Sequence, residues 1–128
     1  MKYCLTTFLI LFLAQSLSSQ GFTGDSWAKA VRNKRANVVL TNAYLPNFSE
    51  SKNGKGSGVC FDIMDDFAKY VEQKYGVVIT YHYRPVSNTS NFQLFLTAVQ
   101  NSEGGVFGLG DITITDQRKK VFDFTPPY

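Results

Sequence analysis

One stretch decides the fold predicted for this chain: Val106-Phe107-Gly108-Leu109-Gly110-Asp111-Ile112-Thr113-Ile114-Thr115, followed by Asp116-Gln117-Arg118-Lys119-Lys120. The run from Val106 to Gly110 is typical of a strand, and polar and hydroxyl residues follow it. A helix over Thr115–Lys120 would begin at a threonine that can cap it. N–H groups at a helix start, nearby hydroxyls and the Arg118 guanidinium together suit a small carboxylate. The stretch therefore predicts a strand that leads into an anion-binding loop.

Upstream of this stretch, strand patterns alternate with helix patterns. Apolar residues recur at helical spacing in two segments, and β-branched and aromatic residues are concentrated in two others. Such alternation predicts an α/β fold with a largely parallel sheet. The expected strands are Val38–Thr41, Val77–Tyr83, Val106–Gly110 and Val121–Phe124, and the expected helices are Ser26–Val31, Ile63–Tyr75, Asn91–Asn101 and Thr115–Lys120.

The ends of these helices carry recognisable signals. Asp62 is expected to cap the helix that begins at Ile63. Ser90, with Gln93 three residues later, matches a capping box for the next helix. The residues from Ala43 to Gly58 have the composition of a long exposed loop. Its Gly54–Gly58 part fails the phosphate-binding loop pattern, because the glycine spacing is wrong.

Two loops are expected to meet at one edge of the sheet. Ligands of parallel α/β sheets bind outside the carboxyl ends of the strands. The loop after Thr41 contains Tyr44, and the loop after Gly110 contains Asp111 and Thr113. The sequence therefore predicts an aromatic wall that faces an anion clamp.

The first twenty residues have the pattern of a secretory signal peptide. Lys2 precedes the apolar run Leu5–Ala14, and small and polar residues follow at Ser16–Gln20. The run is shorter than the about 20 residues that span a bilayer, although an N-terminal anchor is the alternative. We expect residues 1–20 to be a signal peptide, residues 21–128 to form one domain, and the protein to lie in the periplasm or extracytoplasmic space. The formal charge of +3 is mild and does not indicate a nucleic-acid partner.

Cysteine and histidine usage argues against several catalytic classes. Cys60 is the only cysteine outside the expected signal peptide, so no internal disulfide is expected there, and it is interpreted as a core residue. His82 is the only histidine, and no neighbouring residue marks it as a catalytic base. Asp62, Asp65 and Asp66 are interpreted as helix-start residues rather than metal ligands. No metal or cofactor is expected.

The stretch Asp111–Lys120, continued by Phe122-Asp123-Phe124-Thr125-Pro126-Pro127-Tyr128, resembles the signature of the family 3 extracellular solute-binding proteins. These are amino-acid-binding subunits of ABC importers, and they have the type II periplasmic binding protein fold. Weaker similarities are Tyr44–Phe48, which looks like the family's aromatic-proline loop, and Gly58–Met64, which looks like its entry into the first helix. Gly76-Val77 looks like the exit from that helix. The resemblance covers roughly Val38 to Tyr128.

The resemblance implies a role for each of five residues. Arg118 would pair with the ligand's α-carboxylate, and Thr113 would hydrogen-bond the same group. Asp111 stands where the family contacts its ligand, Tyr44 would pack on the ligand side chain, and Phe92 would add a second apolar contact. The implied partners are a small carboxylate ligand, such as an amino acid, and an ABC permease.

The chain departs from the family pattern in two ways. The family usually has a small or neutral residue where this chain has Asp111, which would favour a ligand that carries an ammonium group. The family also has two lobes, and the resemblance implies that this chain is a fragment in which the first lobe is incomplete and the second is absent. The leading hypothesis is a binding protein without enzyme activity. The alternatives on the same fold are a dehydratase-like enzyme or the ligand-binding module of a sensor kinase or lytic transglycosylase.

Overall fold

The computed structural model of the protein describes residues 20–126. Nearly all of the expected signal peptide, residues 1–19, lies outside the described residues, as do Pro127 and Tyr128. No helix among residues 20–126 is long and apolar enough to cross a membrane. The elements are α1 (Trp27–Asn33), β1 (Arg35–Asn42), β2 (Glu50–Lys52), β3 (Lys55–Ser57), α2 (Val59–Tyr75), β4 (Val78–Tyr83), α3 (Phe92–Gln100), β5 (Val106–Leu109) and the 3-10 turn η1 (Arg118–Lys120).

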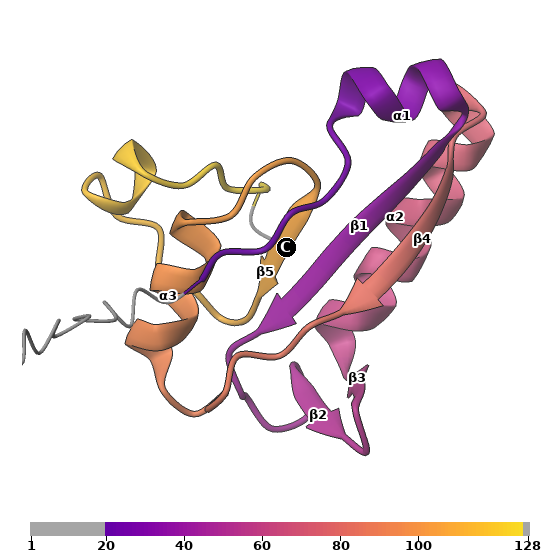
Figure 1. Ribbon diagram of the computed structural model, residues 1–128. Helices are drawn as coiled ribbons and strands as arrows, with labels where there is room; N and C mark the ends of the chain where they lie inside the picture. Colours follow the sequence, from indigo (N-terminus) through magenta and orange to yellow (C-terminus); the bar gives the residue numbers. More distant parts are fainter. Residues whose placement is uncertain (1–19, 127–128) are drawn as a thin grey trace, which may run out of the picture.

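Three parallel strands form the central sheet in the order β4-β1-β5 (Figure 1). β1 is paired on both sides, with Leu40 opposite Tyr83 of β4 and Phe107 of β5. Its central position explains its apolar sequence, because a strand with neighbours on both sides and helices on both faces is almost wholly buried. The predicted α/β fold with a parallel sheet flanked by helices is therefore confirmed.

The helices α2 and α3 cover opposite faces of this sheet. Val38 and Leu40 of β1 belong to the cluster that packs against α2. Gly108 of β5 faces α3 instead, since a Cβ on it would lie 2.9 Å from the Phe95 ring. Phe95 is fully buried in the second cluster. Each face of the sheet therefore has its own core, as the alternation of side chains along a strand requires.

α2 begins at Val59, four residues before the predicted start, and Asp62 does not cap it. The N-cap is Gly58, at φ 106°, and loop carbonyls take the place of a side-chain cap. The Val59 N–H donates to the Asn47 carbonyl at 3.3 Å, and the Cys60 N–H donates to the Phe48 carbonyl at 2.9 Å. The prediction was wrong because these acceptors come from the preceding loop and leave no local pattern.

Two further predictions about local structure are corrected. α3 is capped by Asn91, whose side chain accepts from the Leu94 N–H at 3.0 Å, and not by Ser90. The predicted loop from Ala43 to Gly58 contains the antiparallel hairpin β2–β3. Its strands have three residues each and no apolar alternation, so periodicity could not detect them.

The predicted structure after Thr115 is only partly present. The expected helix over Thr115–Lys120 is reduced to the turn η1, where the Lys119 N–H donates to the Thr115 carbonyl. Val121–Phe124 forms no strand, although its composition favours one. A strand needs a neighbour for its backbone groups, and within residues 20–126 this segment has none.

Candidate functional site

The carboxyl ends of all three strands lie at the same edge of the sheet. The chain leaves β1, forms β4 on one side of it, and then crosses to form β5 on the other side (Figure 1). The crossover from β1 to β4 contains α2 and the crossover from β4 to β5 contains α3, so the two crossovers cover opposite faces of the sheet. Parallel α/β sheets bind ligands at such a switch point. The loop after β1 carries Tyr44, the loop after β4 leads into Phe92, and the loop after β5 carries Asp111 and Thr113.

Backbone hydrogen bonds join these loops. The Ala43 N–H donates to the Leu109 carbonyl at 2.9 Å, which extends the β1–β5 pairing past the end of β1. The Tyr44 N–H donates to the Thr89 carbonyl at 3.0 Å, which fixes Tyr44 to the loop that precedes α3. The Tyr44 side chain is 49% exposed at this edge. The backbone of Tyr44 is thus fixed while its ring remains accessible.

Arg118 connects the loop after β5 to the start of α3. Its Nη1 donates to the Thr113 carbonyl at 2.9 Å, and its guanidinium lies 5.3 Å from the centre of the Phe92 ring. The first contact is a hydrogen bond, and the second has the geometry of a cation–π interaction. Phe92, Thr113 and Arg118 therefore form one cluster, which we call the arginine cluster.

The arginine cluster differs in detail from the predicted anion clamp. The Thr115 hydroxyl accepts from the Arg118 N–H at 3.2 Å, but the N-cap of the turn is Gln117, which makes no side-chain cap hydrogen bond. The turn has only three residues, however, so it presents no helix N-terminus to an anion. Thr113 holds the guanidinium through its carbonyl rather than through its hydroxyl. A guanidinium has five N–H donors, so Arg118 keeps donors for a ligand.

Tyr44 and Asp111 belong to the same edge but not to the cluster. Among residues 20–126, no hydrogen bond, ion pair or ring contact joins either side chain to Phe92, Thr113 or Arg118. Asp111 is exposed to solvent. The five predicted residues thus divide into a connected group of three and two separate side chains.

A buried polar network below this edge was not predicted. The Asn42 Nδ2 donates to the Ser49 carbonyl at 3.2 Å, and the Tyr83 hydroxyl donates to Asn42 Oδ1 at 2.6 Å. Burial raises the pKa of Tyr83 above its ordinary value, so the phenol remains a donor. The network fixes the loop that carries Tyr44. In the sequence, this network could have been recognised from the polar pair Thr41-Asn42, which ends an otherwise apolar run.

Two hydroxyls near the same network are unsatisfied. The Thr41 and Ser49 side chains are fully buried, and their oxygens have no hydrogen-bond partner among the described residues. A buried hydroxyl without a partner costs about 1–3 kcal/mol. The hydrogen-bonding capacity of buried polar groups is therefore less completely used at the carboxyl end of β1 than in the rest of the core.

The residues considered for other chemistry have structural roles. His82 Nε2 lies 2.9 Å from Asn37 Oδ1, and Cys60 is buried in the α2 core. Asp66 pairs with Lys69 at 2.9 Å on the exposed face of α2. Within residues 20–126, no group of three or more His, Cys, Asp or Glu side chains could hold a metal ion.

No protein-family model matches the chain, and comparisons with curated proteins and with solved structures give no significant similarity.

Proposed function

We propose that this protein is the extracytoplasmic binding component of an ABC importer and that it binds an amino acid or a related small carboxylate. The observation that carries the proposal is the arginine cluster, in which a guanidinium joins the loop after β5 to the first residue of α3. Guanidinium groups pair with carboxylates through two parallel hydrogen bonds, and this geometry gives both affinity and orientation.

The restraint on Arg118 supports a binding role. A free arginine side chain loses considerable rotational freedom when it binds a ligand, and this loss weakens binding. Here the Thr113 carbonyl and the Phe92 ring restrain the guanidinium before a ligand arrives. Arg118 is also only partly exposed, and partial burial strengthens its attraction for an anion.

The neighbouring side chains suit the rest of an amino acid. Tyr44 and Phe92 are 49% and 37% exposed, so both rings offer apolar surface for a ligand side chain. The Asp111 carboxylate would repel a simple carboxylate but attract an ammonium group. A zwitterionic or cationic amino acid therefore fits this edge better than a dicarboxylate does.

The proposed fold is the first lobe of a type II periplasmic binding protein. The strand order, with the first strand in the centre and helices on both faces, is compatible with this assignment. In the proposal, a second lobe closes over the ligand by a hinge motion, and the liganded protein delivers its cargo to a membrane permease.

The proposal is tested by calorimetric titration of the protein with a panel of neutral, basic and acidic amino acids. We expect at least one zwitterionic or cationic amino acid to bind, and its methyl ester to bind more weakly. Arg118→Ala should weaken binding about ten- to a hundredfold, because it removes a charge-assisted interaction of about 1.5–3 kcal/mol.

Lys119→Ala is the matched control. Lys119 is an adjacent exposed cation that pairs with Asp116 at 3.6 Å and takes no part in the arginine cluster. Its removal should leave the affinity unchanged. Equal losses in the two variants would show a general charge effect and would contradict a carboxylate site at Arg118. If no amino acid binds at all, the proposed ligand class is wrong.

A further inference from the structure

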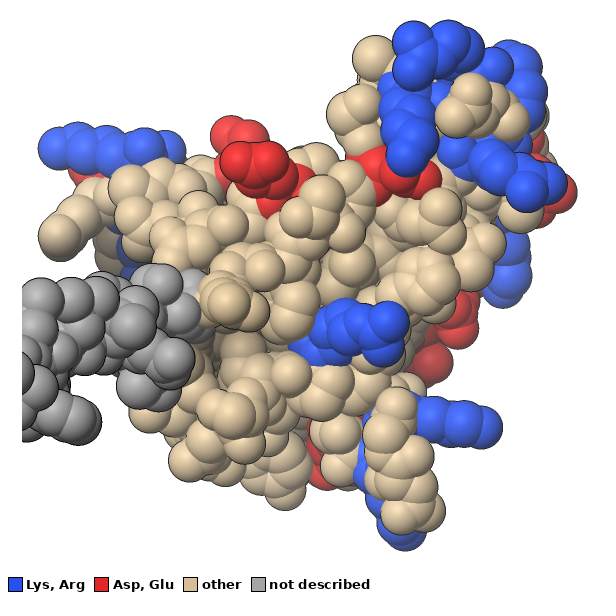
Figure 2. Space-filling model, in the orientation of Figure 1, with Lys and Arg blue, Asp and Glu red and all other residues tan. Residues whose placement is uncertain are grey.

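Basic side chains gather at the end of the molecule opposite the candidate site. Figure 2 shows them over α1 and the adjoining ends of β1 and β4, and the residues concerned are Arg32, Lys34, Arg35 and Lys74. Lys29 is also here, but it is neutralised by Asp25 at 2.6 Å. No ion pair among residues 20–126 uses Arg32, Lys34 or Arg35. The adjoining last turn of α2 contains one acidic residue, Glu72. The basic side chains here outnumber it, so the local charge is positive.

Exposed aromatic rings lie within this basic region. Trp27 is 53% exposed and Tyr75 is 43% exposed, and their rings meet edge to face at 5.1 Å. Lys74 lies 5.4 Å from the centre of the Tyr75 ring. Val31, one turn after Trp27 in α1, is also exposed, at 38%. We call the group Trp27, Val31, Arg32, Lys34, Arg35, Lys74 and Tyr75 the basic corner.

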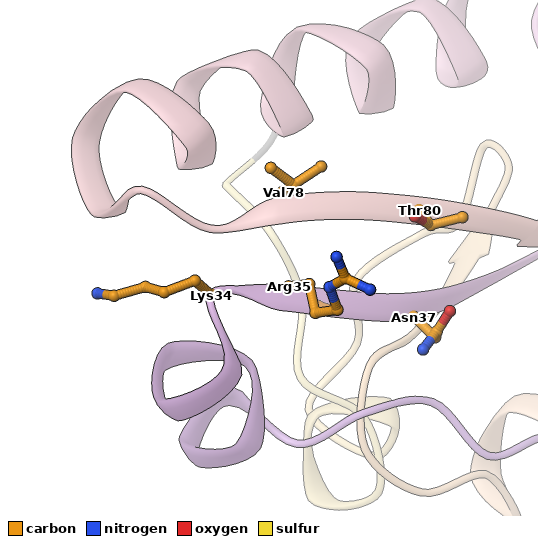
Figure 3. Close-up of a pocket in the computed structure, with 6 residues that line it drawn as sticks. Lys34, Arg35, Asn37, Val78 and Thr80 are labelled. Carbon is orange, nitrogen blue, oxygen red and sulfur yellow. The ribbon is translucent and has the colours of Figure 1, made fainter.

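A shallow pocket opens beside the basic corner. It has a volume of about 280 Å³ and is lined by Lys34, Arg35, Ala36, Asn37, Val78 and Thr80. Figure 3 shows Arg35 between the two strands and Lys34 extending from the start of β1. Asn37 is held in place by bonds to Asp25 and His82. The pocket is at the small end of the range for organic ligands, and its cationic wall suits a phosphate group.

We propose that the basic corner docks on an anionic phospholipid surface, with a headgroup phosphate in the pocket beside Arg35. Positive charge alone would suit any polyanion. The exposed Trp27, Val31 and Tyr75 favour a lipid surface over other polyanions, because amphipathic aromatic rings are stabilised at the headgroup level of a bilayer. Lysine and arginine are in turn attracted to anionic lipids. Docking here leaves the candidate site free, since that site lies at the other ends of the same strands.

Trp27 makes the proposal directly testable, because it is the only tryptophan in the chain. We would titrate the protein with vesicles of phosphatidylcholine and phosphatidylglycerol in equal amounts, and separately with vesicles of phosphatidylcholine alone. The expected result is a blue shift of Trp27 emission with the anionic vesicles only. Added salt should reverse the shift, since ions screen exposed charges over about 10 Å at 0.1 M.

Two charge-matched variants separate the basic corner from net charge. Arg32→Gln, Lys34→Gln and Arg35→Gln together should weaken vesicle binding by about tenfold or more. Lys52→Gln, Lys55→Gln and Lys120→Gln remove the same charge from exposed positions elsewhere and should leave binding nearly unchanged. Both variants keep the apolar N-terminal segment, so any contribution from that segment cancels in the comparison.

Three outcomes of the vesicle titrations would overturn the proposal. The first is equal binding to neutral vesicles, the second is equal weakening by the two triple variants, and the third is vesicle binding without a change in Trp27 emission. Inorganic phosphate and heparin serve as further probes. If heparin binds as tightly as the vesicles and competes with them fully, while Trp27 stays in water, the basic corner is a polyanion site and not a lipid-docking surface.

Discussion

The position of the Arg118 guanidinium depends on two neighbours of different kinds. One is the Thr113 backbone carbonyl, and the other is the Phe92 ring. The sequence could predict that the loop with Thr113 lies at the carboxyl-end edge, because the carboxyl ends of parallel strands share an edge. Phe92 entered the predicted site only through the family resemblance. The sequence could not predict the bond to the Thr113 carbonyl, since every residue has this acceptor and none is marked by its side chain.

Asp25 is a second residue whose environment leads to a prediction. Its carboxylate accepts from Lys29 Nζ at 2.6 Å and from the Asn37 backbone N–H at 2.8 Å. The hydrogen bond from Lys29 is the largest of the causes that lower the pKa of Asp25 from 3.8 to about 2. The ionised form therefore holds the segment before α1 against β1.

The lowered pKa of Asp25 determines how stability depends on pH. A carboxyl group with a lower pKa in the folded state stabilises the fold above its unfolded pKa, and this contribution disappears as the pH falls through the folded pKa. The contribution of Asp25 should therefore be lost between about pH 4 and about pH 2. Urea unfolding across this range should show a shallower pH dependence in Asp25→Asn than in the unmodified protein.

Asp116→Asn provides the comparison for this measurement. The Asp116 side chain is 98% exposed, and its pair with Lys119 is longer, at 3.6 Å. Exposed ion pairs of this kind contribute little to stability, so the pH dependence should stay as in the unmodified protein. If Asp25→Asn behaves like Asp116→Asn, Asp25 does not anchor the N-terminal segment.

At the scale of elements, the buried stripe of α2 was predicted in part and the last residue of the helix, Tyr75, was predicted correctly, but the start of the helix was not. Residues such as Met64 and Val71 are buried on one face of α2 because the 3.6-residue period is a local property. The start of α2 depends instead on the Phe48 carbonyl, which comes from another segment. The strand predicted over Val121–Phe124 does not form for the same reason, because a strand requires a neighbouring strand that composition does not reveal.

The start of α2 gives a prediction about Gly58. Its φ of 106° is unfavourable for a side chain, and a Cβ would lie 2.6 Å from the Phe48 carbonyl oxygen. Gly58→Ala should therefore lower the free energy of unfolding by about 2 kcal/mol or more, measured by urea denaturation. The substitution adds backbone strain and a collision at the same position.

Gly54 separates these two causes. It also has a positive φ, of 73°, but no atom lies within 4 Å of the place where its Cβ would be. Gly54→Ala should therefore cost only the strain of the left-handed conformation, about 1 kcal/mol. Equal losses at Gly54 and Gly58 would mean that the close approach of Phe48 contributes nothing to the start of α2.

At the scale of the whole molecule, the parallel sheet separates two surfaces. The loop with Tyr44 follows the carboxyl end of β1, the arginine cluster joins the loop after β5 to the start of α3, and the basic corner with Lys34 and Arg35 lies at the opposite ends of β1 and β4 (Figure 1). A parallel sheet brings about this separation because all strands point in the same direction. Substitutions at sites this far apart and without shared partners are expected to act independently.

The central claim is that a small carboxylate binds at the carboxyl-end edge through Arg118. The most direct test is a ¹⁵N–¹H NMR titration of the protein with the amino acid that calorimetry identifies as its best ligand. We predict saturable shifts of the backbone amides of Tyr44, Phe92, Thr113 and Arg118, while those of Lys34 and Arg35 stay fixed. Shifts confined to the Lys34–Arg35 end of the sheet, or saturable binding that leaves the Arg118 amide unmoved, would contradict the claim.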